Sequence, residues 1–187
     1  MHIILIGYRG TGKSAVGKRL AEKLQLPFCD TDECIEKTAG RSIQALVEEN
    51  GWEYFREREC EVIREVTAME RSVIATGGGA VMDERNAGIL KKHGLLIWLM
   101  ADVRTIVQRI QRDKKSSEQR PAFSDNDIVQ ETADVLTKRI PVYNRLADFS
   151  IDTAGKNVYE IVDCICQFLS EKKETVCQEI PSASFLK

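Results

Sequence analysis

Residues 7–14 form the pattern Gly-x-x-x-x-Gly-Lys-Ser, directly after an apolar run and before a helical pattern. Its glycines let several backbone N–H groups turn toward one anion, and a helix that begins here points its positive dipole end at the same place. We expect Lys13 to reach the β- and γ-phosphates of ATP and the Ser14 hydroxyl to hold Mg²⁺. The alternative, a glycine-rich turn without function, is disfavoured by the strand–loop–helix context. The predicted nucleotide-binding residues of the loop are Arg9, Gly10, Thr11, Gly12, Lys13, Ser14 and Ala15.

The phosphate loop does not determine what accepts the phosphate. A switch GTPase should carry a guanine-reading Asn-Lys-x-Asp segment, and the sequence has none. Asp102, after the apolar run 95–100, is the one candidate for a second acidic signature, and we interpret it as the cap of the following helix instead.

Two carboxylates, Asp30 and Asp32, follow the second apolar run. Asp30 is predicted to face the metal, through water, because Mg²⁺ keeps much of its hydration shell. Asp32 is predicted to orient an acceptor hydroxyl and receive its proton. For either residue alone, a helix cap is an equally good interpretation.

Two arginines far apart in the sequence, Arg56 and Arg139, could together clamp a carboxylate, since guanidinium binds carboxylate in a bidentate manner. Most arginines in charged helices are solvated, so the residues by themselves do not single these two out. Gly77, Gly78 and Gly79 follow the third apolar run and permit close approach of the backbone to a ligand; a flexible connection is the alternative.

The elements that must position these residues alternate along the chain. Short apolar runs predict strands, and apolar residues at helical spacing predict helices between them. This order predicts an α/β fold: a three-layer αβα domain with a five-stranded parallel sheet, of the P-loop NTPase or nucleoside monophosphate kinase-like type. The expected strands are 2–6, 27–29, 72–76, 95–100 and 149–152; the expected helices include 31–39, 43–50, 53–68, 84–92, 103–111 and 127–146, the last bent or broken at Pro141, and a closing helix after residue 157.

The polar stretch 112–125 lacks apolar periodicity and is predicted to be a mobile lid. Residues 1–172 are expected to form a single domain, followed by a disordered tail at 173–187. The net charge of −2 argues against a chain-wide basic surface for nucleic acid or anionic lipid, and no apolar run has the length of a membrane span. The six cysteines form no C-x-x-C pair, which disfavours a structural zinc site and fits a reducing cytoplasm.

Several of these motifs together resemble the shikimate kinase family. The resemblance rests on Asp30-x-Asp32, Phe55-Arg56-x-x-Glu59, Gly77-Gly78-Gly79 after Ile74-Ala75-Thr76, Arg120-Pro121, and Arg139 four residues before Tyr143. Each motif is weak alone, but their order and spacing, from about residue 3 to residue 170, are specific. The resemblance implies transfer of a phosphoryl group from ATP to the 3-hydroxyl of shikimate, with Mg²⁺, giving shikimate 3-phosphate and ADP. The expected partners are therefore small molecules, and a monomer is the default expectation because the sequence shows no dimer interface.

The resemblance assigns roles by position. Lys13, Asp32 and Arg120 would be catalytic, Arg120 arriving with the lid; Arg56, Arg139 and Gly77–Gly79 would bind shikimate, and Glu59 would orient the acceptor-side arginine. Lys156 and, less well placed, Arg112 would contact adenine. Ala15 stands where the family often has a hydroxyl residue, and Ala122-Phe123 where it usually has aliphatic residues, so lid packing differs. Another small-molecule kinase of this fold, or a nucleotide-binding protein without activity, are the alternative functions.

Overall fold

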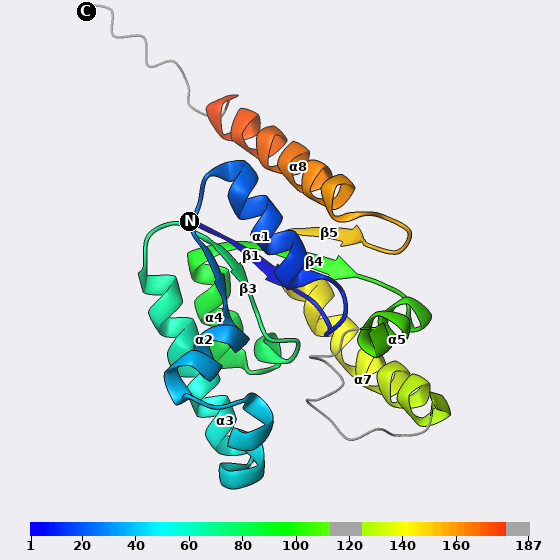
Figure 1. The fold of residues 1–187 in the computed structure, drawn as a ribbon. Coiled ribbons are helices and arrows are strands. Elements are labelled where there is room, and N and C mark those ends of the chain that lie inside the picture. The colour runs from blue at the N-terminus through cyan, green and yellow to red at the C-terminus, as the bar shows by residue number, and fades with distance from the viewer. Residues whose placement is uncertain (113–124, 179–187) are drawn as a thin grey trace, which may run out of the picture.

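The computed structural model describes residues 1–112 and 125–178 of the chain. Its centre is a sheet of five parallel strands in the order β2-β3-β1-β4-β5 (Figure 1). The strands are β1 (His2–Ile6), β2 (Phe28–Asp30), β3 (Val73–Ala75), β4 (Gly94–Met100) and β5 (Phe149–Asp152). This confirms the predicted three-layer α/β fold and its five-stranded parallel sheet.

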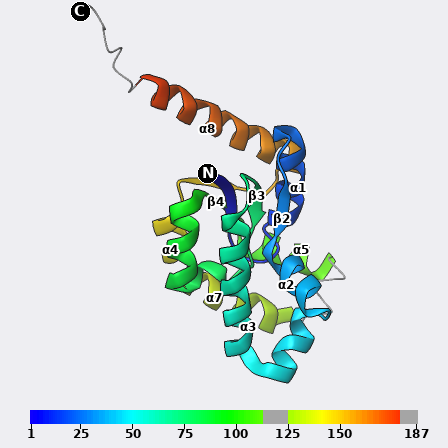
Figure 2. The same cartoon turned by 90° about the vertical axis from the view of Figure 1, so that its left-hand side faces the viewer.

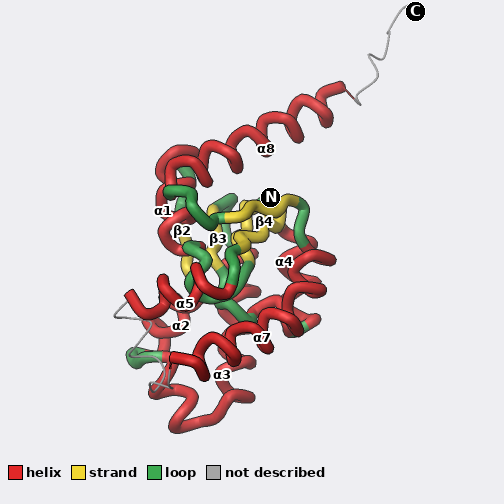
Figure 3. Tube along the Cα trace, turned by 90° about the vertical axis from the view of Figure 1, so that its right-hand side faces the viewer, coloured by secondary structure: helices red, strands yellow, loops and turns green. Residues whose placement is uncertain are grey.

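Helices cover both faces of the sheet, so that the strands lie in the middle of the molecule (Figure 3). Figure 2 shows α1 on one side of the strands and α4 on the other. The helices are α1 (Lys13–Leu24), α2 (Thr31–Ala39), α3 (Ile43–Ala68), the short 3₁₀ helix η1 (Ala80–Met82), α4 (Glu84–His93), α5 (Val103–Arg112), α7 (Asp125–Leu146) and α8 (Val158–Gln178).

The central strand β1 is apolar on both faces because each face packs against helices. Ile3 and Leu5 lie in the same buried cluster as residues of α1 and α8. Ile4 and Ile6 point the other way and belong to a cluster with residues of α3, α4 and α7. The alternation of side chains along a strand thus produces two separate cores, one on each side of the sheet.

Most predicted elements are confirmed to within a few residues, and three details add to the prediction. Gly51 has φ 82° and interrupts α3, which accounts for the two helical segments expected at 43–50 and 53–68. α7 continues through Pro141, so a break of the helix there is wrong. α8 extends to Gln178, past the residue where the domain was expected to end.

The connections from β1 and β3 leave the sheet in opposite directions. β1 leads to β2, beyond β3, whereas β3 leads to β4, on the other side of β1. In parallel sheets, ligands bind outside the carboxyl ends of the strands at such a switch point. The loop after β1, residues 7–12, and the loop after β3, residues 77–79, begin at this point.

Candidate active site

The phosphate loop runs from Gly7 to the start of α1. Gly7 has φ 137°, and a Cβ there would lie 2.4 Å from the carbonyl oxygen of Leu99; Gly12, which precedes α1, has φ 93°. Both positions need glycine because residues with a side chain disfavour a positive φ. At Gly7, Leu99 also leaves no space for a side chain. The loop delivers the N-terminus of α1, with its unpaired N–H groups, to the carboxyl edge of the sheet.

Lys13 lies across this loop. Its Nζ donates hydrogen bonds to the carbonyl oxygens of Gly7 (2.8 Å) and Tyr8 (2.9 Å), and the side chain is buried. Burial lowers the pKa of Lys13 to about 8, against the opposing pull of Asp32 and Asp30. A cation held at this place is suited to phosphate oxygens, which would bring it additional negative charge.

Asp30 combines both interpretations offered by the sequence. Its Oδ1 accepts from the backbone N–H of Asp32 (3.0 Å) and so caps α2. Its Oδ2 accepts a hydrogen bond from the hydroxyl of Ser14 at 2.5 Å, beside the phosphate loop. A hydroxyl and a carboxylate are both hard oxygen ligands, and Mg²⁺ takes few of these from the protein while keeping waters and substrate phosphates. Although the described residues contain no cluster of three or more metal-binding side chains, the pair fits Mg²⁺ bound together with a nucleotide.

A pocket of about 400 Å³, here called the donor pocket, opens along the phosphate loop. Arg109 of α5 is part of it: its Nη1 donates to the carbonyl oxygen of Gly10 (3.3 Å) and to the hydroxyl of Thr153 (2.9 Å). The donor pocket is lined by Arg9, Gly10, Gly12, Lys13, Ser14, Ala15, Asp30, Asp32, Glu33, Glu36, Thr76, Gly78, Arg109 and Ile110.

A second pocket of about 280 Å³, here called the acceptor pocket, adjoins the donor pocket and has one apolar and one cationic side. The apolar side comes from α3, on both sides of Gly51. The acceptor pocket is lined by Arg9, Asp32, Ile43, Gln44, Val47, Glu48, Trp52, Phe55, Arg56, Glu59, Gly77, Gly78, Gly79 and Arg139.

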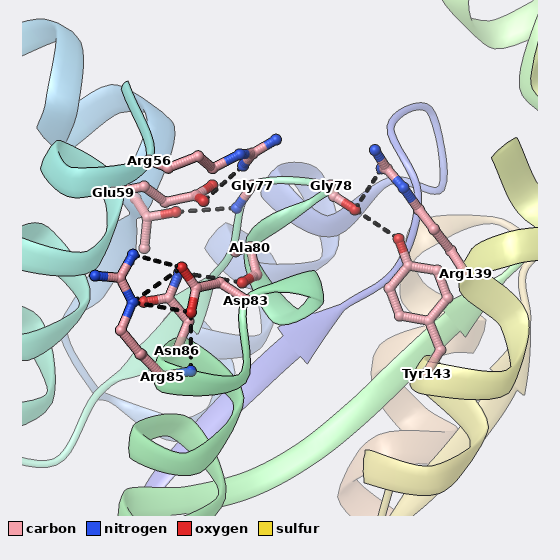
Figure 4. Close-up of polar contacts among 11 residues, drawn as sticks. Arg56, Glu59, Gly77, Gly78, Ala80, Asp83, Arg85, Asn86, Arg139 and Tyr143 are labelled. Atoms are coloured by element: carbon pink, nitrogen blue, oxygen red, sulfur yellow. Dashed lines mark hydrogen bonds and ion pairs between the residues drawn. The ribbon is translucent and has the colours of Figure 1, made fainter. Parts of the chain in front are cut away.

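The cationic side includes, besides Arg9 of the phosphate loop, two arginines from different helices, placed on either side of the glycine loop (Figure 4). Arg56 Nη1 pairs with Glu59 Oε2 at 2.6 Å; Glu59 is 1% exposed, so the predicted orienting contact is present. Burial raises the pKa of Glu59, and the nearby Arg56 opposes that shift. A Cβ on Gly79 would lie 3.0 Å from Arg56 Nη2 and 3.4 Å from Arg139 Nη2, so both guanidinium groups converge on this glycine.

Asp32 faces the same loop from the first turn of α2. A Cβ on Gly77 would lie only 2.6 Å from Asp32 Oδ1, so the carboxylate touches the backbone of the glycine loop. Burial raises the pKa of Asp32 to about 7, with Asp30 adding to the shift and Lys13 opposing it. A carboxylate with such a pKa can take up a proton near neutral pH.

The two pockets share three residues, Arg9, Asp32 and Gly78. They also touch through the backbone, because a Cβ on Gly78 would lie 3.0 Å from the amide nitrogen of Arg9. The loops after β1 and β3 are therefore in direct contact at the switch point. A donor held by the first loop and an acceptor held by the second would meet at Asp32.

The structure brings together most of the residues singled out in the sequence, and leaves a few aside. Thr11 is buried and uses its hydroxyl within the loop, on the carbonyl oxygen of Tyr8 (2.7 Å). Lys156 is exposed, in the loop that follows β5. Residues 113–124 of the predicted lid, with Arg120, lie outside the described residues, whereas its first and last residues belong to α5 and α7. Asp102 accepts from the N–H of Thr105 (2.8 Å), which confirms it as a helix cap.

Two residues of the site gained no role from the sequence. Arg109, rather than Arg112, joins the phosphate loop to the loop after β5. Tyr143 donates a hydrogen bond to the carbonyl oxygen of Gly78. A signal for Tyr143 was present, because it follows Arg139 by one helical turn and so faces the same way.

Comparisons with known proteins agree on one family. The sequence model of the family described as shikimate kinase matches residues 9–170. A shikimate kinase from Syntrophus aciditrophicus is 46% identical over 94% of both chains, and one from Geobacter sulfurreducens is 40% identical over 91% of both. The solved structure of a shikimate kinase from Acinetobacter baumannii in complex with shikimate has a TM-score of 0.85 and 34% identity, covering 92% of this chain and 94% of that one.

A more distant likeness concerns the fold alone. The structure of a gluconokinase from Sinorhizobium meliloti has a TM-score of 0.60 at 15% identity, covering 96% of this chain and 97% of the other. The P-loop kinase fold thus accommodates more than one acceptor.

Proposed function

The chain belongs to the shikimate kinase family, and we propose that it transfers the γ-phosphoryl group of ATP to the 3-hydroxyl of shikimate. The products are shikimate 3-phosphate and ADP, and the hydroxyl proton is released. One observation carries the assignment of the site: Arg56, Arg139 and Asp32, from three different helices, line one pocket that adjoins the phosphate loop.

On the donor side, the phosphate loop and Lys13 bind the phosphates of ATP. Lys13 exchanges its bonds to the carbonyl oxygens of Gly7 and Tyr8 for phosphate oxygens, which neutralise its buried charge better. Phosphoryl transfer needs little covalent chemistry, so holding the phosphates in line and neutralising their charge supply most of the rate. Arg120 of the predicted lid is proposed to add a further positive charge at the γ-phosphate.

Ser14 and Asp30 are the proposed Mg²⁺ ligands, Asp30 through water. When bound, the ion neutralises charge on the β- and γ-phosphate oxygens. The hydrogen bond between Ser14 and Asp30 holds the two oxygen ligands side by side, so the protein needs little rearrangement to use them.

On the acceptor side, Arg56 and Arg139 bind the single carboxylate of shikimate, and the glycine loop approaches its ring. Glu59, which is buried, holds the half-buried Arg56 in place by an ion pair. With the carboxylate fixed at one end of the pocket, the hydroxyl groups at the other end come to Asp32, at the boundary with the donor pocket. Orientation of this kind, rather than affinity alone, is what selects one hydroxyl.

Asp32 is the proposed base that receives the proton of the 3-hydroxyl. Its carboxylate lies against the glycine loop, and its pKa of about 7 makes it a better proton acceptor than an ordinary aspartate. Because Asp32 also lines the donor pocket, the hydroxyl that it orients faces the phosphates.

We further propose that residues 1–172 act as one domain and that the chain works as a cytoplasmic monomer. The net charge of −2 gives no support to a nucleic-acid partner. Among the described residues, no helix has both the length and the apolar character needed to cross a membrane. Light scattering across a range of protein concentrations tests the monomer; a mass that doubles would contradict it.

A coupled assay of ADP release, with shikimate as acceptor, tests the proposed function. Gluconate and nucleoside monophosphates serve as competing acceptors, because the fold is shared with a gluconokinase. We expect turnover with shikimate only, and its loss in Arg139→Ala. ATP binding without turnover of any acceptor would instead identify a nucleotide-binding protein without kinase activity.

A further inference from the structure

The hydroxyl of Tyr143 reaches the glycine loop of the acceptor pocket from behind, although the residue belongs to the core and does not line the pocket. The side chain is 1% exposed, and its ring lies 5.6 Å from that of Trp98 in β4. Its Oη donates to the carbonyl oxygen of Gly78 at 2.5 Å. Arg139, one turn earlier in α7, donates to the same oxygen at 2.9 Å (Figure 4).

The glycine loop has no side chains of its own with which to hold its shape. It is held instead by groups outside it: the Thr31 hydroxyl accepts from the N–H of Gly77 (3.0 Å), and Tyr143 and Arg139 both donate to the carbonyl oxygen of Gly78. Directly after the loop, Asn86 Nδ2 donates to the carbonyl oxygen of Ala80 (3.1 Å). Three glycines in succession lose more conformational freedom on ordering than other residues do. Each of these contacts therefore does more for the position of the loop than the same bond would in a helix.

The carbonyl of Gly78 sets two directions in the pocket. In a planar trans peptide, the N–H of Gly79 points opposite to the carbonyl of Gly78, so holding the carbonyl toward α7 turns that N–H away from α7. The same carbonyl is also the hydrogen-bond acceptor that places Nη1 of Arg139. Loop and guanidinium thus share one reference atom, and the Tyr143 hydroxyl is the second donor to it.

We propose that Tyr143 is a positioning residue for the acceptor: its hydroxyl fixes the Gly78 carbonyl and, through it, the glycine loop and Arg139. This inference rests on the proposed function, and it predicts a change in the handling of shikimate but not of ATP. Burial raises the pKa of Tyr143 to about 12, so the hydroxyl keeps its proton and remains a donor over the whole working range of pH.

A purely structural role is the competing explanation, since the ring fills the core beside Trp98. Tyr143→Phe separates the two, because it keeps the ring and removes only the hydroxyl. Thr67→Val is the matched control: the Thr67 hydroxyl is also buried and donates to a backbone carbonyl, that of Ile63 at 2.7 Å, within α3. Tyr143→Phe loses one short hydrogen bond, and Thr67→Val loses the short bond to Ile63 together with a longer one to the carbonyl oxygen of Arg64 (3.2 Å).

Steady-state kinetics with each substrate, together with thermal unfolding, make the test. Tyr143→Phe is expected to raise KM for shikimate about fivefold to tenfold, with KM for ATP unchanged and kcat within about twofold. Thr67→Val should lower the unfolding temperature about as much as Tyr143→Phe does, and it should leave both KM values unchanged. If the two variants behave alike in kinetics, the positioning role is wrong.

A double-mutant cycle with Arg139→Lys sharpens the result. Both side chains act through the Gly78 carbonyl. The increase in KM for shikimate in the double variant should therefore be smaller than the product of the two single increases. A double variant whose KM increase equals the product of the two single increases would contradict the proposal that both side chains act through the Gly78 carbonyl. Absence of shikimate turnover in the unchanged protein would overturn the proposed function and this inference together, whereas normal turnover with an unchanged KM in Tyr143→Phe would overturn the inference alone.

Discussion

The donor and acceptor pockets are built in different ways, although they share a wall. The donor pocket depends mainly on one continuous segment, residues 7–14, whose backbone and single lysine are proposed to bind the phosphates. The acceptor pocket depends on side chains from three helices and on a loop after β3, spread from Asp32 to Arg139. The first is a local structure, and the second exists only once the whole domain has folded.

This difference predicts which kinetic constant a substitution in each pocket should change. Backbone groups and a helix N-terminus serve any nucleoside triphosphate, so the donor pocket determines the chemistry. Two guanidinium groups and a carboxylate from different elements suit one shape of acceptor, so we expect the acceptor pocket to determine the specificity. Substitutions on the donor side should reduce kcat with every acceptor, and those on the acceptor side should change KM for shikimate.

The largest effect is expected from Lys13→Ala. Removing the one lysine of the phosphate loop should reduce kcat about 10³-fold, because charge developing on the phosphates loses a buried cationic partner. Rapid-quench measurement of shikimate 3-phosphate at saturating shikimate tests this, with ATP binding followed by calorimetry. A variant with near-normal kcat and only a raised KM for ATP would remove the distinction between the two pockets.

A smaller effect, confined to the acceptor, is expected from Arg139→Lys. The charge is kept, but the bidentate contact to a carboxylate and the bond to the Gly78 carbonyl are lost. KM for shikimate should rise about 10-fold to 100-fold, while KM for ATP stays the same. Lys138→Arg, the neighbouring exchange in the opposite sense, is the control; equal changes in both KM values of Arg139→Lys would argue against a dedicated acceptor pocket.

Gly77→Ala probes the contact between the glycine loop and Asp32. The new Cβ would lie 2.6 Å from Asp32 Oδ1, so the carboxylate must move, and we expect kcat/KM for shikimate to fall about 10-fold. Gly88→Ala in α4 is the matched control, since a Cβ there meets nothing within 4 Å. That control should keep full activity and stabilise the fold by about 0.5–1 kcal/mol. Unchanged kinetics in Gly77→Ala would show that Asp32 does not need its present position.

The smallest effect concerns His2, at the opposite end of β1 from the phosphate loop. Its Nδ1 accepts from the N–H of Ser72 (3.2 Å), its Nε2 lies 3.2 Å from the carbonyl oxygen of Thr67, and burial lowers its pKa. The folded protein therefore holds His2 neutral, while the unfolded chain protonates it near pH 6.5. Its contribution to stability is complete above that pH and is lost as the pH falls toward the lowered pKa of the folded state.

Urea unfolding at pH 7.5 and pH 5.5 measures this contribution. His2→Gln should lose less stability on acidification than the unchanged protein, and both KM values at pH 7.5 should stay normal because His2 is remote from both pockets. His93→Gln, which also removes one imidazole, is the matched control. Identical pH slopes for the unchanged protein and His2→Gln would contradict the assignment.

The sequence predicts local features well and distant contacts poorly. The phosphate loop, the five strands and the interruption near Gly51 follow from residue type and periodicity over short segments. Arg109 and Arg112 lie three residues apart on one helix, so periodicity does not choose between them; only the packing of α5 beside the phosphate loop does. Likewise, the sequence around Tyr143 is typical of a core residue. The partner of its hydroxyl, the Gly78 carbonyl, is known only once the position of the loop after β3 is known.

The acceptor residues themselves were predicted through the resemblance of several motifs to one family, because no short segment contains them. Physical reasoning on Arg56 alone gives a solvated arginine, and the structure shows why that fails: Glu59, buried beside it, needs its charge. The continuation of α7 through Pro141 was not predictable from the residue, since proline usually interrupts a helix.

The interruption of α3 at Gly51 also makes the acceptor pocket modular. Ile43 and Val47 come from the segment before the glycine, whereas Phe55, Arg56 and Glu59 come from the segment after it. The part of the apolar side that precedes Gly51 is thus encoded separately from the arginines that recognise charge. Substitutions within residues 43–50 could therefore be used to fit a bulkier alcohol that bears a carboxylate. The arginines, the proposed base and the phosphate loop would stay unchanged.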